Sequence, residues 1–142
     1  MTKWLVRVVA VLAFAVPCAG CVGQRPRALS TAGNDAIANA FASHASGVQV
    51  TADGIVSSVL PDDNNGDRHQ RFIVRLASGQ TVLIAHNIDI APRLPALAAG
   101  DSVALSGVYE WNAQGGAVHW THHDPSGQHP TGWLRYNGRT YQ

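Results

Sequence analysis

The sequence predicts one small, mostly β domain that follows a leader segment. Most of the 142-residue chain has β-branched and apolar residues at alternating positions, and clusters of Gly, Pro, Asn and Asp separate these runs. The first residues differ, because two basic residues precede an apolar run that ends in small residues. A chain of this length suits a single domain with a modest core.

Residues 1–21 have the layout of a signal peptide. The uncharged apolar run over 8–16 is shorter than the ~20 residues that a membrane-spanning helix needs. It ends in Ala19-Gly20-Cys21, which resembles a lipoprotein cleavage site, although Cys18 stands where such sites usually carry Leu. We therefore expect an exported protein that is lipidated at Cys21 and faces the periplasm from the membrane. Plain secretion and an uncleaved anchor are the alternatives.

Residues 22–33 are polar and without periodicity, which predicts a tether, so the domain is expected over 34–142. Its first element is a short helix over Asn34–Ser43. Asn34 can cap this helix, and Ile37 and Phe41 lie four residues apart on one face. The helix is too short to be stable alone and is expected to pack on the β domain.

Five strands are expected after the helix: Val48–Leu60, Arg71–Leu76, Gln80–His86, Ser102–Trp111 and Ala117–His122. Pro92 and Pro95 leave room only for a short helix or turn between the third and fourth. This order is typical of a five-stranded OB (oligonucleotide/oligosaccharide-binding) barrel. A small β-sandwich is the alternative.

A C-terminal hairpin completes the domain. Asn137-Gly138 separates the runs Trp133–Tyr136 and Arg139–Tyr141, and Asn-Gly favours a type I′ turn.

Charge and cysteine content limit the possible partners. Behind Cys21 the chain has eight Arg and no Lys against eight Asp and one Glu, a net charge of −1 with neutral histidines. This balance disfavours nucleic acid as a partner, because tight binding needs many cations to neutralise phosphates. Both cysteines fall in the leader region, so no disulfide or cysteine-based metal site is expected in the domain.

A histidine-rich segment follows the fifth predicted strand. Imidazole and carboxylate side chains suit zinc above all, or copper or nickel, so a divalent metal is the candidate cofactor. The competing interpretations are a solvated polar strand end and proton-transfer chemistry. The candidate metal ligands are His119, His122, His123, Asp124 and His129.

Glu110 and His119 are the candidate catalytic residues. If Ala113–Gly116 is the loop of their hairpin, Glu110 lies opposite His119 and Tyr109 lies opposite Trp120. A carboxylate beside an imidazole can orient the ring or raise its pKa. A cross-strand pair that only stabilises the sheet is the alternative.

A second polar surface is expected on the hairpin around Ser78-Gly79. With a two-residue turn, His86 pairs with Arg71 and shares its face with His69. The opposite face is then core, formed by Phe72, Val74, Leu76, Leu83 and Ala85. OB barrels usually hold ligands across their second and third strands. The candidate ligand-binding residues are His69, Arg71, His86, Asn87, Asp89 and Trp120.

Five segments together resemble a known family. They are Leu60–Asp63, Arg68–Phe72, Ala85–Arg93, Gly116–Pro125 and Gly132–Leu134. On these motifs the chain resembles the uncharacterised exported bacterial family DUF3465 from about Gly54 to Tyr141. The resemblance implies no activity. It does imply that the histidine-bearing segments are the hallmark of the family.

We therefore expect a cell-envelope module that binds a small ligand through a histidine-rich face, with a divalent metal as the candidate cofactor. One alternative is a metal-dependent hydrolase acting on phosphodiesters. Another is a structural envelope protein that docks a protein partner. Contact with the membrane is expected only through a lipid on Cys21.

Overall fold

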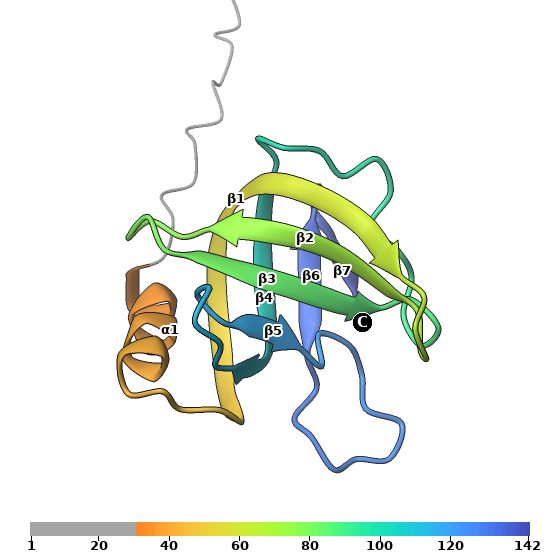
Figure 1. Ribbon diagram of the computed structural model, residues 1–142. Helices are drawn as coiled ribbons and strands as arrows, with labels where there is room; N and C mark the ends of the chain where they lie inside the picture. The colour runs from red at the N-terminus through yellow and green to blue at the C-terminus, as the bar shows by residue number, and fades with distance from the viewer. Residues whose placement is uncertain (1–30) are drawn as a thin grey trace, which may run out of the picture.

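The computed structural model describes residues 31–142 and shows one helix beside a curved sheet (Figure 1). The predicted signal peptide, Cys21 and residues 22–30 of the predicted tether lie outside the described residues. In the described part of the chain, no helix is long and apolar enough to cross a membrane. The elements are α1 (Thr31–Ala42), β1 (Val48–Asp63), β2 (His69–Arg75), β3 (Thr81–Asn87), β4 (Ser102–Glu110), β5 (Ala117–His119), β6 (Trp133–Tyr136) and β7 (Arg139–Tyr141).

Five of the strands close into a ring. The hydrogen-bonded order is β1-β2-β3-β5-β4, and β4 pairs back with β1. The β3–β5 pairing is parallel, and the other pairings are antiparallel. The hairpin β6–β7 extends the sheet from β4, with positive φ at Asn137 and Gly138 as a type I′ turn requires. The mostly β fold with a short helix and a C-terminal hairpin is therefore confirmed.

The long strand β1 makes this closure possible. Its first half, Val48–Ile55, pairs with β4, and from Ile55 onward it pairs with β2 (Figure 1). Gly54 lies where the strand passes from one partner to the other. A Cβ at Gly54 would stand 2.5 Å from the carbonyl oxygen of Arg75, so the close approach requires glycine.

The core fills the inside of the ring, and α1 packs against β1. Ile37 on α1 is fully buried, as the helical spacing predicts. The helix begins at Thr31, earlier than expected, so Asn34 lies inside it and does not cap it. The largest fully buried side chains on the strands include Tyr109, Phe72, Ile84, Leu105 and Leu134.

The expected register of the β2–β3 hairpin is wrong by one residue. His86 pairs with Gln70, and Arg71 pairs with Ala85. Leu76 N donates to Gln80 O, so the turn holds one residue more than the predicted Ser78-Gly79 pair. A shift of one residue moves every side chain of a strand to the other face. Val82, Ile84 and His86 therefore point into the core, where Leu83 and Ala85 were expected.

One further expectation is wrong. The fifth strand ends at His119 and does not continue to His122, because Trp120 has a positive φ of 53° that turns the chain away. The segment between β3 and β4 forms turns, one of the two forms that Pro92 and Pro95 allow. Its position is fixed by Gln70, whose side chain donates to Leu94 O and accepts from Leu94 N at 3.0 and 2.9 Å.

Candidate ligand-binding groove

Three adjoining pockets run across the outer face of β2, β3 and β5. The first and the middle pocket share His69 and His119, and the middle and the third share Arg71 and Leu83. Their volumes are about 220, 330 and 250 Å³. We call this continuous depression the histidine groove. The first pocket is lined by Asp67, His69, Asn87, Ile90, His119, Trp120 and His122.

Two imidazoles of the first pocket have a fixed ring orientation. His69 Nδ1 lies 2.8 Å from the carbonyl oxygen of Asp67, and His122 Nδ1 lies 2.8 Å from that of His123. A carbonyl oxygen only accepts, so each neutral ring carries its proton on Nδ1. The Nε2 atom of each ring is then an acceptor, and no hydrogen bond within the described residues engages it.

His119 occupies the boundary between the first and the middle pocket. Its Nε2 lies 3.5 Å from Glu110 Oε1, an ion-pair distance without hydrogen-bond geometry. Burial lowers the pKa of His119, although Glu110 acts in the opposite direction. The pairing register places Glu110 opposite Ala117 and not opposite His119. The expected register was off by two residues, which keeps both side chains on one face and still brings them together.

Trp120 forms one side of the first pocket in a conformation that few side chains adopt. Its positive φ is uncommon for a bulky residue, and such positions often mark functional sites. The indole stacks on His129 with ring centroids 4.1 Å apart. It also contacts the tilted ring of His122 at 5.5 Å. These contacts hold a half-buried aromatic surface at the end of the groove.

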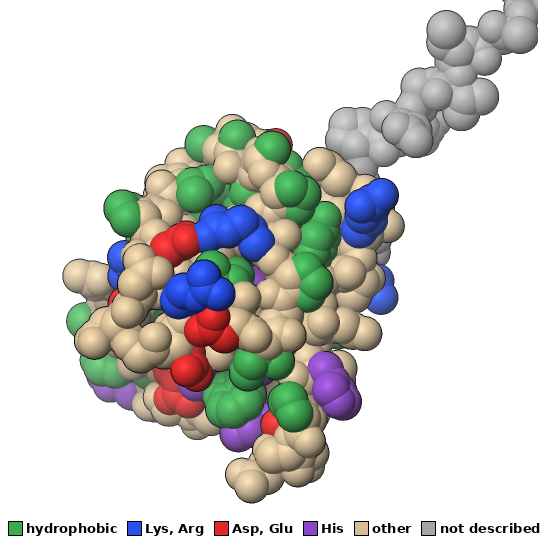
Figure 2. All heavy atoms as spheres, turned by 90° about the vertical axis from the view of Figure 1, so that its right-hand side faces the viewer, with side chains coloured by type: hydrophobic (Ala, Val, Ile, Leu, Met, Phe, Trp, Pro, Cys, Tyr) green, Lys and Arg blue, Asp and Glu red, His purple; other side chains and the backbone are tan. Residues whose placement is uncertain are grey.

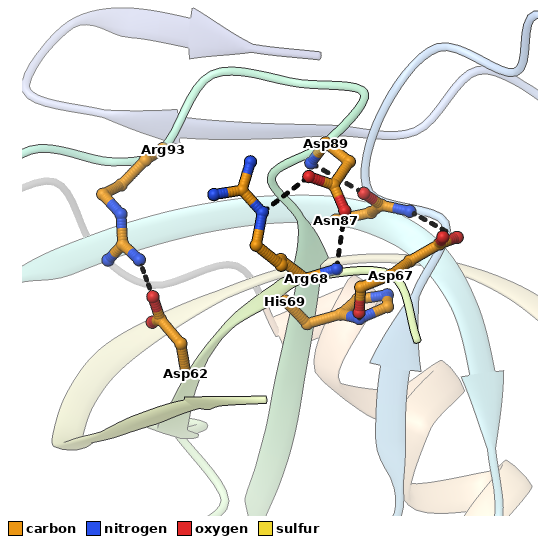
Figure 3. A network of polar contacts seen from close by, with 7 residues as sticks. All are labelled: Asp62, Asp67, Arg68, His69, Asn87, Asp89 and Arg93. Atoms are coloured by element: carbon orange, nitrogen blue, oxygen red, sulfur yellow. Dashed lines mark hydrogen bonds and ion pairs between the residues drawn. The ribbon is translucent and has the colours of Figure 1, made fainter. Parts of the chain in front are cut away.

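A network of polar contacts builds the rim beside the first pocket (Figure 3). Arg68 donates to Asp89 from its backbone nitrogen and from Nε, both at 2.7 Å. These bonds hold the pKa of Asp89 below its usual value. Asn87 Oδ1 accepts from Asp89 N, and Asn87 Nδ2 donates to Asp67 at 3.3 Å. The loop before β2 and the loop after β3 are thereby joined.

An ion pair between Arg93 and Asp62 joins the loop after β3 to the end of β1 (Figure 3). On the face shown in Figure 2, basic and acidic side chains lie next to one another in the middle, and histidine side chains lie towards the lower part. The rim is therefore a surface of mutually compensated charges and not a basic patch.

Asp124 organises the loop that follows Trp120. One carboxylate oxygen accepts from the backbone nitrogen and the hydroxyl of Ser126, and the other accepts from the backbone nitrogens of Gln128 and His129. The hydrogen bond from the Ser126 hydroxyl is the main cause that holds the pKa of Asp124 well below its usual range. Both oxygens are thus engaged in shaping the loop that carries His129.

Sequence comparison gives the family. The model described as "Protein of unknown function (DUF3465)" matches residues 21–142. The chain belongs to the DUF3465 family. No curated protein and no solved structure matches it.

For this DUF3465 protein, the structure brings together only part of the expected ligand-binding set. His69, Arg71, Asn87 and Trp120 all line the histidine groove, in the first or the middle pocket. His86 does not, because it is fully buried on the inner face of β3. Asp89 is exposed on the rim and is not among the residues that line the three pockets.

The expected metal ligands are distributed over different surroundings. His119 and His122 line the first pocket, His123 is exposed, Asp124 binds its own loop, and His129 stacks on Trp120. Within residues 31–142, no three His, Cys, Asp or Glu side chains form a group that could hold a metal ion. The divalent metal stays a prediction.

Two residues that line the first pocket of the DUF3465 protein were not expected from the sequence. Asp67 belongs to the Asp- and Asn-rich turn before β2, where composition indicates only a turn. Ile90 is 46% exposed and lines the first pocket. Its exposure could have been inferred from the sequence, because this isoleucine precedes two prolines in a segment without strand character.

Proposed function

We propose that this DUF3465 protein is an exported OB-like module that binds a small organic ligand in the histidine groove. The strand order β1-β2-β3-β5-β4-β1 and the parallel β3–β5 pairing support an OB-like barrel. The layout of the leader, with basic residues before an apolar run that ends in small residues, supports export and lipidation at Cys21.

One observation carries the binding proposal. Side chains from β2, β3, β5 and the segment after β5 converge on one groove, on the face where OB barrels usually hold ligands. Two of them, His69 and His122, present an unengaged Nε2 that is fixed in orientation by a backbone carbonyl. A pre-oriented acceptor costs little conformational entropy when it binds.

The binding proposal is tested by an NMR screen of the domain against compound mixtures of separate classes: sugars, amino acids, amines, nucleotides and Zn²⁺. Binding in the groove predicts that one class shifts the ring resonances of His69, His119 and His122 together. His69→Gln should weaken this response by about tenfold, the equivalent of one lost hydrogen bond.

His123→Gln is the matched control, because His123 lies in the same region of the chain but is exposed. It should leave the response unchanged. Shifts that cluster on the β6–β7 hairpin, or no response to any class, would contradict the proposal.

The contact between His119 and Glu110 favours a second candidate function, hydrolysis of a bound ligand. An imidazole whose pKa is lowered by burial stays neutral near pH 7 and can act as a general base. Release of product from a chromogenic phosphodiester or glycoside panel tests it. Activity should depend on Glu110 and His119, and a panel without turnover would exclude it.

A further inference from the structure

We propose that the ligand of the histidine groove is an uncharged oligosaccharide. This inference rests on the proposed function and adds the chemical class of the ligand. It follows from four properties of the groove: apolar lining residues, planar polar side chains among them, an excess of carboxylates interrupted by one arginine, and an excess of acceptors.

The lining of the groove combines apolar and polar side chains. In the middle pocket, Leu83, Ala85 and Ala117 lie beside Asp63, Arg71 and Glu110. The third pocket repeats the pattern, with Leu60, Ile73 and Leu83 beside Asn112 and Gln114. A sugar ring has the same division, because its C–H faces are apolar and its hydroxyls project from the edge. Carboxylate, guanidinium and amide groups can each contact two neighbouring hydroxyls.

Charge disfavours the other common polymers. Three carboxylates line the groove, from Asp63, Asp67 and Glu110, against the single guanidinium of Arg71. A polyanion such as a nucleic acid would meet a net negative surface. A polycation would meet Arg71 in the middle of the groove. An uncharged ligand avoids both penalties.

The first pocket supplies the surfaces that a sugar ring uses for stacking. Trp120 is half-buried, and Ile90 is 46% exposed beside it. An aromatic face next to an aliphatic side chain suits the C–H face of a pyranose. Around this apolar surface, Asp67 and the Nε2 atoms of His69 and His122 act as acceptors. Sugar hydroxyls are the donors that such a set requires.

The continuity of the groove indicates a chain of sugars and not a single ring. The three pockets share residues pairwise and run from the segment after β5 to the turn between β4 and β5. A monosaccharide would fill one pocket and leave the polar side chains of the others unused.

The experiment is isothermal titration of the purified domain, in the presence of a chelator, with cellotetraose, maltotetraose, tetra-N-acetylchitotetraose and mannotetraose. A heparin tetrasaccharide and a short single-stranded oligonucleotide are the anionic comparisons, and spermine is the cationic one. At least one uncharged tetrasaccharide should bind, more tightly than its monosaccharide by tenfold or more, and the charged probes should not.

Arg71→Gln and Arg75→Gln form a matched pair on β2. Arg71 lines two pockets, whereas Arg75 is exposed at the end of the strand outside them. Loss of the Arg71 hydrogen bonds should weaken the sugar about tenfold, and Arg75→Gln should change nothing. Circular dichroism of both variants confirms that each is folded.

Each other result has a distinct meaning. Binding of a charged probe in the groove, without any sugar, overturns this inference and leaves the proposed function standing. Sugar binding that is lost with chelator, or that both arginine variants retain equally, also overturns it. If the NMR screen finds no ligand of any class, the proposed function and this inference fail together.

Discussion

His86 and Thr121 are joined by a buried hydrogen bond of 2.8 Å between the His86 Nδ1 and the Thr121 hydroxyl. On the other side of the ring, His86 Nε2 donates to Pro92 O at 3.1 Å. A carbonyl only accepts, so the proton is on Nε2 and the hydroxyl is the donor to Nδ1. This one side chain ties β3 to the segment after β5 and to the loop before β4, and so holds two walls of the histidine groove.

The burial of His86 predicts a loss of stability in mild acid. Burial is the main cause that lowers the pKa of His86 from 6.5 to about 4. The unfolded chain therefore binds a proton between these pH values that the folded protein does not. Stability should be greatest above pH 6.5 and should fall by about 3 kcal/mol as the pH drops to 4.

Urea unfolding at pH 7 and pH 4.5 measures this effect. His86→Leu should lower stability at pH 7 by about 2–3 kcal/mol, since Thr121 and Pro92 lose their partner, but should flatten the pH dependence. His123→Gln, at an exposed position, should keep the wild-type slope. An equal slope in His86→Leu and wild type would show that other groups cause the acid sensitivity.

Replacement of Gln70, which holds the loop after β3, should cost as much stability as replacement of an apolar core residue. Its amide makes two reciprocal hydrogen bonds with the backbone of Leu94 and is buried. Gln70→Ala should destabilise the domain by about 2–4 kcal/mol, because it leaves a buried carbonyl and a buried N–H unpaired. Gln49→Ala, at an exposed position on β1, is the comparison and should cost under about 1 kcal/mol. Chemical denaturation of both variants provides the test.

The loop that carries His129 should loosen when Asp124 is replaced. Asp124→Ala removes the acceptors of the Gln128 and His129 backbone nitrogens. We expect hydrogen exchange of these two amides to become at least about tenfold faster. Ser126→Ala removes a single hydroxyl donor and should have a smaller effect. Unchanged protection in Asp124→Ala would mean that the stacking of His129 on Trp120 alone orders the loop.

The leader sequence predicts that Cys21 carries a lipid. Expression in a bacterial host with labelled palmitate should label the wild-type protein, and Cys21→Ser should abolish the label. Cys18→Ser is the control and should leave the label in place. Labelling that survives in Cys21→Ser, or secretion of an unlabelled wild-type protein, would contradict lipidation at Cys21.

The amino-acid sequence predicts the positions of the elements more accurately than their registers. The strands, the Asn137-Gly138 turn and the helix are found close to their expected positions, because periodicity and turn chemistry are local properties. Loop length is harder to infer. Ala77 adds one residue to the turn before Gln80. As a result, His86 lies on the inner face, where Ala85 was expected.

The candidate site was predicted in part for the same reason. The β4–β5 loop was also longer than expected, since Asn112 Oδ1 accepts from Gln114 N and Gly116 N within it. Here the shift was by two residues, so Glu110 and His119 still share a face. What the sequence did not reveal is the role of Trp120, whose positive φ ends β5 and directs His122 into the groove.

A crystal structure of the domain with the first ligand found would show whether the histidine groove is the binding site. We predict ligand density over β2, β3 and β5, in contact with His69, His119 and Trp120. A larger pocket of about 780 Å³ lies elsewhere, between β1, β4 and the β6–β7 hairpin, and is lined by Asp53, Ser102 and Arg135 among others. Density in that pocket, with the histidine groove empty, would mean that the histidine groove is not the binding site.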